Sequence, residues 1–235
     1  MMKKNGFTLA EVLITLAIIG VVATLTLPAL MTNTAEQQAK TALKKGINTL
    51  TEAAQMNQAI AGFDYASLTV AGTSQEDANT QSLYGLLSQR ASVDYQKSKI
   101  ASNIQLSKKS GDTYGSYQGN NVVGSNFALF FRDGSALLFP ADTTTDDNAM
   151  KMQDDNLVYG IPVIYDTNGT KGPNIVSNCS GGSKGVTTDK AQAANETLDQ
   201  VCTKTTRVIK DQFGVRLRGG YAVPNGPAAR WAFEN

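Results

Sequence analysis

Residues 6–31 read GFTLAEVLITLAIIGVVATLTLPALM, and this stretch decides the fold of the N-terminal part of the chain. The run from Val12 to Met31 has no charged residue, and as a helix it would be about 30 Å long, the thickness of a bilayer core. Glu11 stands at the start of this run. A carboxylate in apolar surroundings is costly and is usually functional. The sequence therefore predicts a partner for Glu11.

The charges around the apolar run predict its orientation in a membrane. Lys3 and Lys4 precede the run, and the next basic residue, Lys40, comes well after its end. By the positive-inside tendency the N-terminus stays in the cytoplasm and the bulk of the chain is exported. A secretory signal peptide is disfavoured because the run is long, Glu11 interrupts its beginning and no A-x-A cleavage site ends it. A plain single-span anchor explains the length but gives Glu11 no role.

Composition argues against catalysis and against nucleic-acid binding. The 235 residues carry a net charge of +1 and include no His, which is the commonest general base and metal ligand. No nucleotide-binding or hydrolase motif is present, so we expect no enzyme. Arg216 and Arg218 would share one face of a strand in a locally basic region, but acidic residues are interspersed and DNA binding is not indicated. We interpret these arginines as protecting an exposed strand.

The two cysteines, Cys179 and Cys202, lie in the C-terminal part of the chain. If that part is exported, an oxidising compartment lets them pair. Free thiols in a cytosolic protein are the alternative. The predicted export favours the disulfide, which would close a loop in the C-terminal part of the chain.

The pattern after the apolar run predicts that the same helix continues. Small and apolar residues recur at helical spacing and form one stripe, with polar residues opposite. The stripe consists of Ala39, Leu43, Ile47, Leu50 and Ala54. Gly62 is the expected stop of the helix.

The remainder of the chain predicts a short helix followed by strands. Leu83, Leu86 and Leu87 indicate the helix. Residues 127–140 form the clearest hairpin, with Asp133-Gly134 expected as a two-residue type I′ turn. Further strands are expected within residues 156–166 and 207–218. A long helix laid against an antiparallel sheet is an α+β fold.

The N-terminal residues carry a family resemblance. The stretch KKNGFTLAEVLITLAIIGVVATLTLPAL resembles the prepilin N-terminus of type IV pilins and type II secretion pseudopilins. The shared pattern is a short basic leader ending in Gly, then Phe, Thr, Leu, any residue and Glu, then an apolar helix. The resemblance covers about thirty residues, and it includes Pro28, where family members often carry a helix-kinking proline.

The resemblance implies how the N-terminus is processed. A membrane-bound prepilin peptidase would cut between Gly6 and Phe7, and the new amine of Phe7 would be N-methylated. The carboxylate of Glu11 would pair with such an amine, commonly that of a neighbouring subunit. Pro28 would kink or locally melt the turn before it.

The resemblance also implies the organisation of the chain, its partners and its location. We expect a leader at 1–6, a transmembrane and assembly helix at 7–31, its amphipathic continuation at 32–62 and an exported globular head at 63–235. Expected partners are identical or related subunits, the prepilin peptidase, an inner-membrane assembly platform and the lipid bilayer. The chain would lie in the inner membrane and then in a periplasmic or extracellular filament.

A calcium site is one of two interpretations of residues 166–174, which read DTNGTKGPN. Asp166 and Asn168 resemble part of a calcium loop. The distal Glu of such a loop is absent, and Asn-Gly and Gly-Pro form turns without any metal. We expect no cofactor, with calcium at Asp166 and Asn168 as the alternative.

These observations predict a structural function. The chain is expected to polymerise through its N-terminal helix into a type IV pilus or a type II secretion pseudopilus. The alternative is an exported protein with a single membrane-spanning anchor, which binds a ligand or DNA and does not polymerise.

Overall fold

The computed structural model describes residues 6–72, 75–94, 99–100, 126–140, 143–144, 160–172, 174–179, 184–189 and 201–235. The chain divides into two units, Met1–Gln38 and Ala39–Asn235. The long helix α1, Leu9–Ala61, contributes to both units. It ends where the sequence predicted, because Gly62 follows with a φ of 78°, a left-handed conformation that favours glycine.

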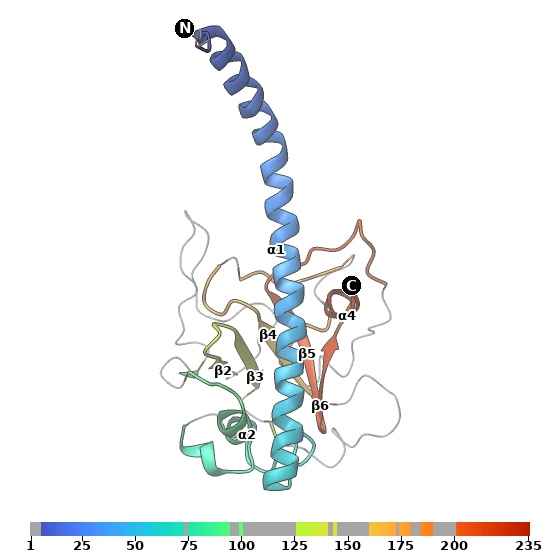
Figure 1. The fold of residues 1–235 in the computed structure, drawn as a ribbon. Coiled ribbons are helices and arrows are strands. Elements are labelled where there is room, and N and C mark those ends of the chain that lie inside the picture. The colour runs from blue at the N-terminus through green and yellow to red at the C-terminus, as the bar shows by residue number, and fades with distance from the viewer. Residues whose placement is uncertain are drawn as a thin grey trace. The chain divides into compact units, whose positions relative to one another are not determined.

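The second unit combines part of α1 with one antiparallel sheet (Figure 1). Among the described residues, six strands follow one another in chain order across the sheet, and each pairs with the next in antiparallel orientation. Their bounds are β1 Lys99–Ile100, β2 Asn126–Phe130, β3 Ala136–Pro140, β4 Ile161–Asp166, β5 Gln212–Arg218 and β6 Tyr221–Asn225. The remaining helices are η1 Gln75–Asn79, α2 Leu83–Arg90 and α4 Pro227–Glu234. The predicted α+β class is confirmed.

The predicted apolar stripe of α1 packs into the main core. Leu43, Leu50 and Ala54 are fully buried, and the other two members of the stripe are at most 8% exposed. They share this core with a row of side chains that the strand register aligns across four strands. That row is Leu129, Leu137, Tyr165 and Phe213.

The opposite face of the sheet is buried as well. Ala128, Leu138 and Ile164 form a second, smaller core with Val186. The segment 184–189 covers this face, and its Gly185 carbonyl accepts a hydrogen bond from the Asn225 side chain at 2.8 Å. A Cβ atom at Gly214 would lie 1.9 Å from the Gly185 carbonyl oxygen, so the two glycines permit this close approach.

The hairpin of β2 and β3 is confirmed, but its turn differs from the predicted one. Phe131 N–H donates to the Ser135 carbonyl, and Gly134 N–H donates to the Phe131 carbonyl. Three residues therefore form the loop, with Gly134 at a φ of 94° and Asp133 at a negative φ. A type I′ turn needs positive φ at both central residues, whereas a three-residue loop places only its glycine there. Asp133 instead accepts hydrogen bonds from the backbone and side chain of Ser135.

Strand β5 is not an exposed strand, as the sequence interpretation assumed. It lies between β4 and β6, and Arg216 is only 2% exposed. The interpretation of Arg216 as a residue that protects an exposed strand is therefore wrong. Its strand is covered by the segment that packs on the second face of the sheet.

Gly46 lets the sheet approach α1 closely. A Cβ atom at this position would lie 2.2 Å from Cζ of Tyr165, well inside van der Waals contact. Ala is the better helix former by about 1 kcal/mol in an exposed helix. At Gly46 the clash reverses that preference.

We predict that Gly46→Ala destabilises the protein by about 1–3 kcal/mol, because the Tyr165 ring must move. Thermal unfolding followed by circular dichroism measures the change. The control is Asn48→Ala on an exposed position of the same helix, which should leave stability unchanged or raise it slightly. A Gly46→Ala variant that is more stable than the parent would contradict the close packing described above.

Candidate functional site

The predicted cleavage site lies outside the helix. Gly6, Phe7 and Thr8 precede the first helical residue, and Phe7 is 89% exposed. The peptide bond between Gly6 and Phe7 is therefore exposed and lies outside the helix.

Glu11 has a partner within the chain, which sequence reasoning missed. The backbone N–H and the hydroxyl of Thr8 both donate to Glu11 Oε2 at 2.8 Å. Thr8 Oγ1 in turn accepts from the Glu11 N–H at 3.3 Å. Thr8 is the residue before the helix and Glu11 is its third residue, so the two form a capping box. The T-x-x-E spacing in the sequence is the signal that could have found it.

The capping box leaves part of the Glu11 carboxylate available. Both bonds from Thr8 go to Oε2, and among the described residues none is recorded to Oε1. One carboxylate oxygen can therefore accept a further donor while the helix N-terminus stays capped.

The helix segment that follows is not buried by the rest of the protein. The segment Leu9–Leu27 is long and apolar enough to cross a membrane, and none of it is buried in the protein. Its threonine hydroxyls are satisfied inside the helix, since Thr15, Thr24 and Thr26 donate to the carbonyls of Val12, Val21 and Val22. Glu11 is then the one charged side chain of this segment. This composition suits a helix that crosses a membrane.

Pro28 lies inside α1 and does not interrupt it. The helix is assigned without a break from Leu9 to Ala61, and the expected kink or local melting before Pro28 stays a prediction. Proline lacks the N–H that would bond to the carbonyl of residue 24. The part that Pro28 plays in assembly stays a prediction.

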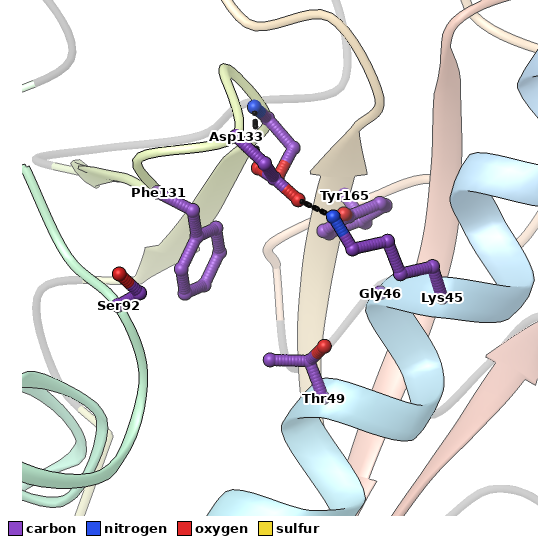
Figure 2. A pocket seen from close by; sticks show the side chains of 8 residues that line it. Lys45, Gly46, Thr49, Ser92, Phe131, Asp133 and Tyr165 are labelled. Carbon is purple, nitrogen blue, oxygen red and sulfur yellow. Dashed lines mark hydrogen bonds and ion pairs between the residues drawn. The ribbon is translucent and has the colours of Figure 1, made fainter.

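A cavity of about 190 Å³ lies in the second unit, between α1 and the turn that joins β2 to β3 (Figure 2). The rings of Phe131 and Tyr165 line it, and Lys45 pairs with Asp133 at its mouth, with 2.7 Å between Nζ and Oδ2. Burial raises the pKa of Tyr165 to about 12, so its hydroxyl stays protonated at neutral pH. Nothing in this lining resembles an acid–base pair that could carry out catalysis.

The ion pair at the mouth keeps Asp133 charged. Partial burial acts to raise the pKa of Asp133, but hydrogen bonds from Lys45 and Ser135 outweigh burial and lower it below its ordinary value of 3.8. Its stabilising contribution is therefore present above about pH 4 and is lost as the pH falls below that value. Both partners are partly exposed, so the contribution is small.

The two residues predicted to bind calcium form a turn. Asp166 ends β4 and is fully buried, and its two oxygens accept from the Asn168 N–H at 3.1 Å and from the Gln212 side chain at 3.0 Å. The nearby Asp211 accepts from the N–H groups of Asn174 and Ile175. Burial raises the pKa of Asp211. This arrangement fits a turn held by side chains better than a calcium loop, and calcium at Asp166 and Asn168 stays a prediction.

The acidic pairs at 146–147 and 154–155 lie outside the described residues. Within the described part of the chain no cluster of three or more acidic, His or Cys side chains is placed to hold a metal.

The two cysteines are joined as predicted, with 5.4 Å between the Cα atoms of Cys179 and Cys202.

We predict that Thr8→Val loosens the first turn of α1 while Thr8→Ser preserves it, because only Ser keeps the capping oxygen. The first helical amides should exchange hydrogen roughly fivefold faster in Thr8→Val, measured by NMR on the full chain in detergent micelles. Equal exchange in the two variants would mean that the capping box does not form in solution.

Comparisons with known proteins identify the N-terminal segment alone. Residues 1–27 match the family described as the prokaryotic N-terminal methylation motif. Neither the comparison with curated proteins nor the comparison with solved structures gave a match. The match includes Gly6, Phe7, Thr8 and Glu11, whose geometry is described above. The chain is thus a prepilin-like protein whose N-terminal methylation motif marks the family of type IV pilins and type II secretion pseudopilins.

Proposed function

We propose that the chain is a structural subunit that polymerises through α1 into a type IV pilus or a type II secretion pseudopilus. The observation that carries this proposal is Glu11, a carboxylate with one oxygen in a capping box and the other available, at the start of a helix segment without cover. A plain anchor has no use for a charge at this position.

Cleavage by a prepilin peptidase between Gly6 and Phe7 would supply the partner of Glu11. The cut creates an ammonium group at Phe7, next to Thr8, in the same apolar surroundings as the carboxylate. An ion pair between this group and a Glu11 oxygen neutralises both charges, and removing one partner leaves the other uncompensated. When the amine belongs to a neighbouring subunit, the pair fixes the register between the two chains.

The remaining features of α1 suit this use. Covering the segment Leu9–Leu27 requires lipid before assembly and neighbouring helices afterwards. Pro28 leaves one carbonyl without its helical donor, and neighbouring chains or threonine hydroxyls can satisfy such groups. The chain would start in the inner membrane with its N-terminus in the cytoplasm and its head exported, and an assembly platform would draw it into the filament.

We predict that Glu11→Gln is cut after Gly6 as usual but lowers the yield of sheared filaments at least tenfold, because the neutral amide cannot pair with the ammonium group. The yield is measured as the fraction of the chain recovered in the sheared fraction of cells. The matched control is Glu52→Gln, which removes an exposed carboxylate from the same helix and should assemble normally. Normal assembly of Glu11→Gln would exclude the charge pair. If the parent chain is never recovered outside the membrane, the alternative of an anchored binding protein holds.

A further inference from the structure

Trp231 contacts two cations in the second unit. It is the only tryptophan of the chain and belongs to α4. Lys40 Nζ and Arg207 Cζ each lie 4.0 Å from the centre of its rings. Both cations are therefore in contact with the same indole. A cation over an aromatic face is attracted by it, and more strongly where water is excluded.

We call the contact of Lys40 and Arg207 with Trp231 the stack. The burial of Lys40 makes it unusual. Lys40 is only 5% exposed, although lysine is almost never buried to this extent. Its charge needs compensation there, and the indole face supplies part of it. The stack joins three separate parts of the chain: α1 at Lys40, α4 at Trp231, and the segment after Cys202 at Arg207.

Arg207 owes its position to a short segment held at both ends. On one side Val208 and Asn178 exchange two backbone hydrogen bonds, of 2.9 and 3.0 Å. On the other side Arg207 N–H donates to Thr203 at 3.2 Å, and Cys202 is bonded to Cys179. Opening the disulfide would leave this segment attached from one side, by hydrogen bonds.

We propose that the stack couples the disulfide to helix α1. The closed Cys179–Cys202 bond holds Arg207 over Trp231, and the stack holds α4 against Lys40. Closing the bond removes two electrons and two protons from two thiols, and an external disulfide oxidant accepts them. The biological meaning rests on the proposed export: docking of α4 on α1 would be complete only in a head that has reached an oxidising compartment.

The coupling must be reciprocal, because a bond that stabilises the stack is stabilised by it to the same extent. The first test measures the equilibrium between the disulfide and reduced and oxidised glutathione, on the full chain in detergent micelles. Lys40→Met keeps the apolar stem but removes the charge, and Arg207→Gln removes the other cation. Each should make the disulfide about two- to tenfold easier to reduce. Lys204→Gln, an exposed neighbour of the disulfide, is the matched control and should change nothing.

The result for Lys40→Met decides the inference, because Lys40 belongs to α1 and has no bond to either cysteine. An unchanged glutathione equilibrium in Lys40→Met would overturn the coupling, whatever Arg207→Gln does. Circular dichroism checks that each variant is folded.

A second measurement needs no substitution. Because Trp231 is the single tryptophan, its quenching by acrylamide reports the stack alone. Reduction of the parent chain with a phosphine should raise the quenching constant at least twofold while far-UV circular dichroism stays constant. Equal quenching in the oxidised and reduced chain would overturn the proposal. Neither measurement depends on polymerisation, so failure here is distinguishable from failure of the proposed function.

Discussion

The central physical constraint in this molecule is an apolar helix segment that the protein itself does not bury. The segment Leu9–Leu27 is long and apolar enough to cross a membrane, and none of it is buried in the protein. Its threonine hydroxyls are satisfied within the helix, as polar groups in hydrocarbon require. Glu11 alone combines a charge with an available acceptor oxygen. The surroundings of this segment must therefore accommodate one negative charge, that of Glu11.

In the second unit the same helix packs against a sheet. Beyond Ala39 the helix buries a stripe of small and apolar residues against one face of an antiparallel sheet, while the other face carries its own core. Gly46 allows the Tyr165 ring to approach the helix, and the segment 184–189 packs on the other face of the sheet. A helix with an apolar stripe thus becomes part of a globular head.

Sequence reasoning was most reliable where one pattern determined one structure. The stripe of α1, the stop at Gly62, the helix at Leu83 and the hairpin at 127–140 follow from helical or alternating periodicity and from strong turn residues. The disulfide followed from the predicted export. The predicted type I′ turn at Asp133 was wrong. The loop has three residues, and Asp133 is hydrogen-bonded to Ser135, which the Asp-Gly dipeptide alone does not reveal.

Features that depend on tertiary contacts were missed. Strand β6 contains Pro224 and follows Gly219-Gly220, a hairpin signal that we overlooked. Helix α4 is short, and its buried alanines have meaning only against the sheet. The burial of Arg216 and the close approach of Gly185 to Gly214 are tertiary features, and no local pattern predicts them. The capping box of Thr8 and Glu11 was also missed, although its T-x-x-E spacing is a signal in the sequence.

The intact mass and N-terminal sequence of the chain from native membranes or sheared filaments test the central claim most directly. The account predicts a mature chain that begins at N-methylated Phe7 and has two hydrogen atoms fewer than the dithiol form, one from each of Cys179 and Cys202. A chain that still begins at Met1 would leave Glu11 without the amine it is proposed to meet. A cut beyond Met31 would mean a secretory signal peptide and would contradict the account as a whole.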